Sequence, residues 1–207
     1  MLELLNSLAV SFDLPILNWI QSNLQCTFLD YFMRIITWFG DGGIFWIACA
    51  VILLFFPKYR KAALTMGLAL IMGVLICNVT IKPLVGRPRP LDFAALNNIA
   101  VVYPQHLVDI WGKEVVFMAD PSFPSGHTIA SFEASVALLM YSKKLGIPAL
   151  ILAILVSLSR LYLFVHYPTD VLVSVVLGTL FALIAYAIMK NRKFCDPKYG
   201  KYERTAA

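Results

Sequence analysis

Long apolar segments separated by short polar ones dominate the pattern of the chain. Five of them indicate membrane-spanning helices, because a bilayer core about 30 Å thick needs roughly 20 residues to cross. They cover residues 44–56, with a start near Trp38, and residues 62–81, 128–141, 147–161 and 171–189. The pattern predicts an all-α, polytopic membrane helix bundle.

The first 40 residues fit this pattern less well. Two apolar stretches, 14–20 and 28–39, are interrupted by Asp13, Pro15, Asp30 and Arg34. We expect amphipathic helices that lie in the membrane interface, and the alternative is a sixth span built from them. The predicted organisation is an N-terminal interfacial segment at 1–40, a transmembrane core at 41–190 and a basic tail at 191–207.

Composition supports a membrane protein. Hydrophobic residues make up 60% of the 207 and charged residues 14%, whereas soluble domains have about 45–50% and about 25%. The four cysteines have the spacing of neither a zinc site nor a disulfide framework, so we interpret them as small apolar side chains.

The basic residues mark one side of the bundle. Three join the first two spans, two join the third and fourth, and six lie in the tail, which accounts for 11 of the 17. With five alternating spans these segments share one side, which the positive-inside rule makes cytoplasmic. The excess of positive charge is therefore a topology signal, and nucleic-acid binding is not expected. The residues are Lys58, Arg60, Lys61, Lys143, Lys144, Lys190, Arg192, Lys193, Lys198, Lys201 and Arg204.

Three polar clusters stand at span ends on the opposite side. They are Lys82-Pro-Leu-Val-Gly-Arg-Pro-Arg89-Pro90, then Pro124-Ser125-Gly126-His127, then Ser159-Arg160 followed by His166 and Asp170. Each cluster alone has an ordinary structural explanation, such as a helix stop or a cap. Their convergence on one face indicates a functional site.

The residue types in these clusters suit a phosphate group. Lys82, Arg89 and Arg160 bring three cations together, and the arginine fork can bind two phosphate oxygens at once. Gly126 opens a helix whose free N–H groups attract anions, and Ser125 can cap that helix and donate its hydroxyl to phosphate.

The two histidines suggest a division of roles. Asp170 follows His166 by four residues, close enough to hold one imidazole nitrogen while the other attacks. His127 comes from a different helix and can act as the acid for the leaving oxygen.

The clusters resemble the three signatures of the type 2 phosphatidic acid phosphatase superfamily, K-x6-RP, PSGH and SR-x5-H-x3-D, without departure in residue or spacing. The resemblance implies that His166 forms a phosphohistidine, oriented by Asp170, and that His127 protonates the leaving oxygen. It further implies no metal and no cofactor. Arg87 lies outside the signature and is a secondary candidate. The phosphate ligands that it implies are Lys82, Arg89, Ser125, Gly126 and Arg160.

The same resemblance implies a substrate class. Soluble vanadium-dependent haloperoxidases and eukaryotic glucose-6-phosphatase share this core, but five spans and short loops favour a bacterial phosphatase in the plasma membrane that acts on a phospholipid or polyprenyl phosphate outside the cytoplasm. We expect undecaprenyl diphosphate, with a role in cell wall biogenesis, ahead of phosphatidylglycerol phosphate and phosphatidic acid. The alternatives from other classes are a lipid phosphotransferase and a non-hydrolytic lipid-binding protein.

Two features have no role in these signatures. Glu133 lies inside a predicted span and is either a functional group on the path of the lipid or a neutral packing residue. The long outer loop between Pro90 and Pro124 is predicted to form a wall of the head-group pocket.

Overall fold

The computed structural model describes residues 2–102 and 120–191. Every regular element within these ranges is a helix, which confirms the predicted class. Residues 103–119, the middle of the loop predicted to form the head-group wall, lie outside the described residues.

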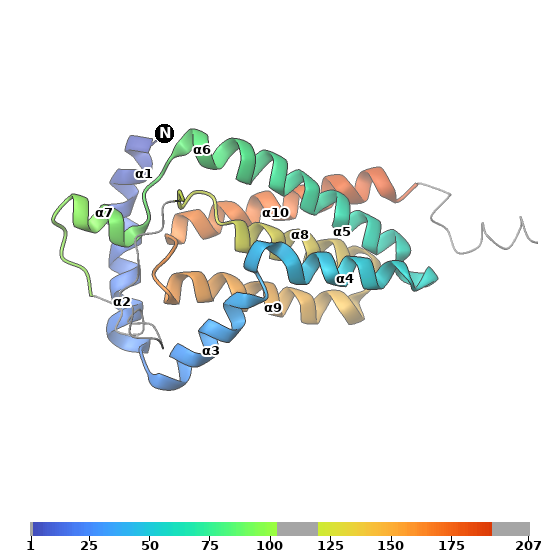
Figure 1. Cartoon of the computed structure of the whole chain (residues 1–207), viewed down its shortest axis with the longest axis horizontal. Helices are drawn as coiled ribbons and strands as arrows, with labels where there is room; N and C mark the ends of the chain where they lie inside the picture. The colour runs from blue at the N-terminus through green and yellow to red at the C-terminus, as the bar shows by residue number, and fades with distance from the viewer. Residues whose placement is uncertain (1, 103–119, 192–207) are drawn as a thin grey trace, which may run out of the picture.

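Five helices lie side by side and form the bundle (Figure 1). They are α4 (Ile44–Leu54), α5 (Arg60–Gly73), α8 (Gly126–Tyr141), α9 (Lys143–Tyr162) and α10 (Pro168–Met189). The π-helical segment η4 (Val74–Ile81) and the short helix α6 (Lys82–Val85) extend α5 beyond the core. All five match predicted spans to within a few residues.

Helix α8 is the centre of the bundle and contacts α5, α9 and α10 most extensively. Its small side chains, such as Ala134 and Ala137, are fully buried and pack against Trp46 and Met66. Small residues let neighbouring helix backbones approach closely, as is common in membrane bundles. A side chain at Gly178 of α10, for example, would come within 2.8 Å of the Ile129 carbonyl oxygen.

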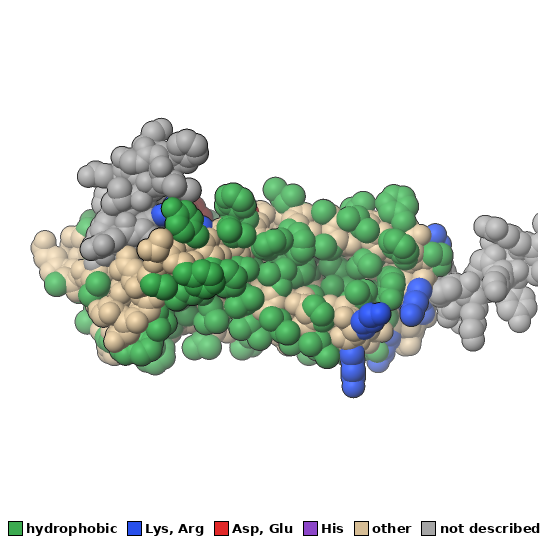
Figure 2. Space-filling view, turned by 90° about the horizontal axis from the view of Figure 1, so that it is seen from below, with side chains coloured by type: hydrophobic (Ala, Val, Ile, Leu, Met, Phe, Trp, Pro, Cys, Tyr) green, Lys and Arg blue, Asp and Glu red, His purple; other side chains and the backbone are tan. Residues whose placement is uncertain are grey.

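Four helical segments in the described ranges are long and apolar enough to cross a bilayer, namely Thr27–Leu54, Pro57–Leu96, Lys143–Tyr162 and Pro168–Met189. The fifth bundle helix, α8, has only 16 residues and rises about 24 Å at 1.5 Å per residue. Helices α9 and α10 have 20 and 22 residues, and the N-terminus of α8 is recessed behind the ends of these two helices (Figure 1). Figure 2 shows apolar side chains along the bundle and Lys and Arg side chains at the end far from this recess.

The N-terminal residues form an arm outside the bundle. Segments α1 (Leu2–Leu8), η1 (Ala9–Asp13) and α2 (Leu14–Leu24) follow one another and cross the end of the bundle (Figure 1). Buried Leu14 and Leu17 pack there against Phe93 and Phe164. The arm therefore covers the same end of the bundle as the polar clusters.

Helix α3 (Thr27–Trp38) leads from this arm back to the bundle. Phe28, Tyr31, Ile35 and Trp38 are all exposed, and their spacing places them on one face of the helix. Helices at both predicted interfacial stretches are thus present, although α3 also continues into the first candidate span. The location of the arm in the membrane interface stays a prediction.

The close contact of α8 with α9 can be tested at Gly146. A Cβ there would lie 2.3 Å from Leu139 Cα, whereas a Cβ at Gly67 of α5 would meet nothing within 4 Å. Gly146→Ala should cost about 1–3 kcal/mol through overpacking, and Gly67→Ala, the matched control, should be neutral or stabilising by about 0.5–1 kcal/mol. Thermal unfolding in detergent measures both, and an unchanged melting temperature for Gly146→Ala would contradict the packing described.

Candidate active site

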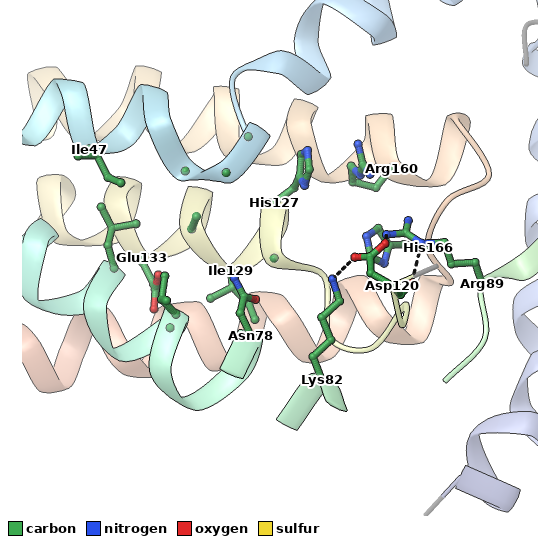
Figure 3. Close-up of a pocket in the computed structure, with 18 residues that line it drawn as sticks. Ile47, Asn78, Lys82, Arg89, Asp120, His127, Ile129, Glu133, Arg160 and His166 are labelled. Carbon is green, nitrogen blue, oxygen red and sulfur yellow. Dashed lines mark hydrogen bonds and ion pairs between the residues drawn. The ribbon is translucent and has the colours of Figure 1, made fainter. Parts of the chain in front are cut away.

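A pocket of about 280 Å³ opens at the recessed N-terminus of α8 (Figure 3). Its wall combines the turn before α4, the α5–η4 segment, α8, the last turn of α9 and the loop before α10. Of the eight residues predicted from the sequence, six line it: Lys82, Arg89, Gly126, His127, Arg160 and His166. Ser125 and Asp170 are fully buried behind this wall.

Two of the predicted cations converge on a single carboxylate. Lys82 Nζ lies 2.5 Å from Asp120 Oδ2, and one terminal nitrogen of Arg89 lies 2.7 Å from Asp120 Oδ1. Burial opposes ionisation of Asp120, but hydrogen bonds from both cations outweigh it and lower its pKa to about 2. The two cations are thus already arranged around one anionic group. Asp120 belongs to none of the three signatures, and the sequence analysis missed it.

The third cation, Arg160, approaches from α9. It is 6% exposed and donates a hydrogen bond of 2.5 Å to Thr37 Oγ1. Its Nε has no hydrogen-bond partner in the described part of the chain. Arg160 therefore has donor capacity beyond its bond to α3, and it lines the pocket.

Asp170 lies behind His166 and faces its Nδ1. That nitrogen is 3.6 Å from Asp170 Oδ2, longer than a hydrogen bond, and Nε2 is the nitrogen that is left for the pocket. Burial lowers the pKa of His166 to about 4, although the contact with Asp170 offsets part of this effect, and nearby Arg160 and Arg89 lower the pKa further. At neutral pH the imidazole is therefore uncharged, which is the form that a nucleophile needs.

His127 faces a turn that the sequence analysis did not single out. Its Nε2 lies 3.7 Å from Asp41 Oδ1. A side chain at Gly40 would come within 2.8 Å of His127 Cδ2, and Gly42 and Gly43 have φ of 55° and 68°. The glycines thus let this turn close over His127. The only sequence signal was the Asp-Gly-Gly run directly before an apolar segment.

Ser125 is placed differently from what the sequence suggested. It stands at the N-cap of α8, as the sequence predicted, but its side chain makes no capping hydrogen bond, so only that part of the prediction is wrong. Its hydroxyl instead accepts a hydrogen bond from Thr128, and its backbone N–H donates to Ser174 Oγ. These bonds fix the backbone that presents Gly126 to the pocket.

Arg87, the secondary candidate, is fully buried and is absent from the pocket wall. It forms ion pairs of 2.8 Å with Asp13 and 2.5 Å with Asp170. A substrate in the pocket could not reach it, so Arg87 belongs to the support of the site. Asp13 had no signal beyond being an acidic residue in an apolar stretch.

Glu133 lines the same pocket, on the side away from Lys82 and Arg89 (Figure 3). Its side chain is 1% exposed, and its Oε1 has no hydrogen-bond partner within the described ranges. Gly73 makes room for it, because a Cβ there would lie 2.3 Å from Oε1. Glu133 thus lines the cavity, and both interpretations of it stay predictions.

Fold and pocket together define a class, a helical membrane protein with a cationic, histidine-bearing site. Residues 62–194 match the family model described as the PAP2 superfamily. The chain belongs to that superfamily and is a phosphoric ester hydrolase of its lipid phosphatase group.

Individual relatives agree with this assignment. An undecaprenyl-diphosphatase from Sulfolobus acidocaldarius is 28% identical over 86% of this chain and 79% of its own length. Undecaprenyl-diphosphatase BcrC from Bacillus subtilis is 32% identical over 74% of this chain and 73% of its own length.

Two solved structures share the fold. The crystal structure of Aquifex aeolicus LpxE has a TM-score of 0.68 at 20% identity and covers 86% of this chain and 96% of its own. The crystal structure of a PAP2 type phosphatidylglycerolphosphate phosphatase from Bacillus subtilis has a TM-score of 0.65 at 26% identity. The match covers 93% of this chain and 96% of that one.

The pKa of His166 gives a test that needs no substrate. The unfolded chain binds a proton on this histidine near pH 6.5 but the folded chain only near pH 4, so protons favour unfolding in that interval. Wild type should therefore lose stability relative to His166→Gln as the pH falls from 6.5 toward 4, and not above it. Thermal unfolding of both proteins across this range measures the effect, and parallel curves would exclude a buried, neutral His166.

Proposed function

We propose that this chain hydrolyses a phosphate from a lipid phosphate or diphosphate through a phosphohistidine at His166. The observation that carries the proposal is the convergence of three cations and two histidines on one pocket. Such a set can bind a phosphoryl group and attack it within the same cavity. No cofactor or metal ion has a part in the reaction proposed.

The binding step uses the cations. Lys82 and Arg89 converge on the Asp120 carboxylate, and a phosphoryl group offers equivalent oxygens with more negative charge. In the proposal these two residues and Arg160 hold the phosphoryl oxygens, while Gly126 adds the backbone of the α8 N-terminus. Ser125 supports this position from behind the wall. Together they would stabilise the charge of the transition state, which is usually the largest catalytic contribution.

The chemical step begins at Nε2 of His166. Its lone pair forms the N–P bond, the bond from phosphorus to the lipid oxygen breaks, and protonated His127 gives its proton to that oxygen. Asp170 holds Nδ1 and stabilises the imidazolium that results. A water molecule then attacks the phosphohistidine in line, with the now neutral His127 as its base, and releases inorganic phosphate.

A lipid substrate is supported by a second cavity. An apolar groove of about 630 Å³ runs along α4, α5 and the start of η4, and it shares Ile47, Leu70 and Val74 with the catalytic pocket. A hydrocarbon chain lying in this groove would have its phosphate end in the pocket. Most of the free energy of binding would then come from burial of apolar surface, at about 25 cal/mol per Å².

We propose an extracytoplasmic site in the plasma membrane. The N-terminus of α8, where the pocket lies, and the basic α4–α5 and α8–α9 connections are at opposite ends of the bundle (Figure 1). The positive-inside rule assigns the basic end to the cytoplasm. The phosphate would therefore be released outside the cytoplasm.

Undecaprenyl diphosphate is the substrate that we propose first, in carrier recycling for the cell wall. Two relatives of the chain are undecaprenyl-diphosphatases by name. Phosphatidylglycerol phosphate is the second choice, because a structural relative at 26% identity is named for it, and phosphatidic acid is the third. Phosphotransfer and lipid binding without hydrolysis are the alternatives from other classes.

The decisive experiment measures phosphate release by the purified protein from these three lipids with EDTA present. Wild type should release phosphate, its order of preference identifies the substrate, and His166→Ala should abolish turnover. His166→Ala with substantial activity would exclude the phosphohistidine route, and a strict need for added Mg²⁺ would exclude metal-free catalysis. A folded wild type without release would favour transfer or lipid binding.

The acid role of His127 predicts dependence on the leaving group. His127→Ala should slow hydrolysis of phosphatidic acid by about 10²–10⁴-fold, because its leaving alkoxide needs a proton. With p-nitrophenyl phosphate, whose leaving oxygen is stable as an anion, the loss should be much smaller. Equal losses on both substrates would show that His127 does not act as the acid.

A further inference from the structure

The N-terminal arm reaches the back of the His166–Asp170 pair. Asp13, at the end of η1, accepts hydrogen bonds from the backbone N–H and the hydroxyl of Thr169, at 2.9 and 2.7 Å. Thr169 directly precedes Asp170 in the first turn of α10. Asp13 and Asp170 are both fully buried, so these contacts are part of the protein interior.

Arg87 connects the two carboxylates. One terminal nitrogen donates to Asp170 Oδ1 at 2.5 Å and the other to Asp13 Oδ2 at 2.8 Å. The second nitrogen also donates to the Leu5 carbonyl oxygen at 2.8 Å. The guanidinium carbon lies 3.7 Å from the centre of the Tyr167 ring, which fixes the plane of the fork. Arg87 is therefore held between the arm and the catalytic pair.

The charges of this chain of residues are unequal. Two carboxylates face one guanidinium, so the fully buried set of Asp13, Arg87 and Asp170 carries a net charge of −1 when all are ionised. A buried charge without compensation is costly. The group in contact with the set that can become positive is His166, whose Nδ1 faces Asp170.

The cations on the pocket side of His166 are the reason why a negative charge is needed behind its ring. Arg89 and Arg160 both oppose a positive charge on its imidazole. Behind the ring, the positive charge of Arg87 alone would neutralise the negative charge of Asp170. The negative charge of Asp13 neutralises that of Arg87, so Asp170 keeps its electrostatic effect on His166.

We propose that Asp13 is a positioning residue for phosphoryl transfer, which it serves by binding Arg87 and keeping the support of His166 net negative. This inference rests on the function proposed above. When Nε2 of His166 forms the N–P bond, the P–O bond electrons leave with the lipid oxygen, which takes the proton of His127. The imidazole gains one positive charge, and together with the buried set the total becomes zero. Attack of water on phosphorus returns the pair of electrons to Nε2 and restores the net charge of −1.

Asp13 lies outside the part of the chain that the family model covers, which begins at residue 62. Its contact with Arg87 joins residues 74 positions apart. By this inference Asp13 supports the catalytic pair from outside the segment that the family model covers.

Asp13→Asn tests the inference, since it removes the charge and keeps the size of the side chain. We expect kcat to fall by about 10–100-fold, the loss typical of groups that orient a reacting residue from behind. Inhibition by inorganic phosphate, which reports binding to the pocket cations, should change little. Affinity for orthovanadate, which takes up the five-coordinate geometry of the transferring phosphoryl group at the histidine, should fall by the same factor as kcat.

Gln21→Leu is the matched control for loosening of the arm. Gln21 is a buried residue of α2 whose Nε2 donates to the Tyr162 carbonyl oxygen at 2.7 Å. Its replacement removes a contact between arm and bundle without touching Arg87 or Asp170. The melting temperature should fall, while kcat and the ratio of vanadate to phosphate affinity should stay near the wild-type values.

Thr169→Val is the second variant, should Asp13→Asn not fold. It keeps all three charges but removes the hydroxyl between Asp13 and Arg87. A smaller loss of kcat with a matching loss of vanadate affinity supports the inference, and loss of phosphate and vanadate affinity alike contradicts it.

The outcomes separate the inference from the proposed function. Unchanged kcat in Asp13→Asn, or an equal loss of kcat in Gln21→Leu, overturns the inference alone and leaves an active phosphatase. A folded wild type that releases no phosphate from any of the lipids overturns the proposed function and the inference with it.

Discussion

The buried ion cluster around Arg87 is the interaction on which the rest of the site depends. Three charged side chains with no solvent exposure would be unfavourable in an apolar bundle if any one lost its partner. Their mutual contacts therefore tie the N-terminal arm, the segment after α6 and the start of α10 into one unit. The same unit contains Asp170, so the order of the arm and the geometry behind His166 have a common cause.

The length of α8 determines where the pocket lies. This helix is shorter than α9 and α10, and its N-terminus lies in a recess that side chains of several other segments line. Lys82, Arg89 and Arg160 arrive from different elements, which explains why no single stretch of sequence looks like a phosphate site. Asp120 balances two of these cations. The recess also adjoins the apolar groove along α4 and α5. A polar surface and an apolar surface therefore lie next to each other.

The superfamily match covers the catalytic helices but begins at residue 62. Two carboxylates before that point are connected to the pocket histidines. Asp13 binds Arg87, which in turn binds Asp170 behind His166, and Asp41 lies 3.7 Å from His127.

The sequence by itself determined the helical bundle, the end at which the polar clusters lie and six residues of the pocket wall. It could do so because hydrophobic length, charge asymmetry and motif spacing are local properties. Only the tertiary structure decided that Arg87 supports Asp170, that Ser125 lies behind the wall, and that Asp13, Asp41 and Asp120 belong to the site. The pairs concerned are 31 to 156 residues apart, and whether a charged side chain binds substrate or another side chain depends on burial. Burial is a property of the packed helices, which no local pattern records.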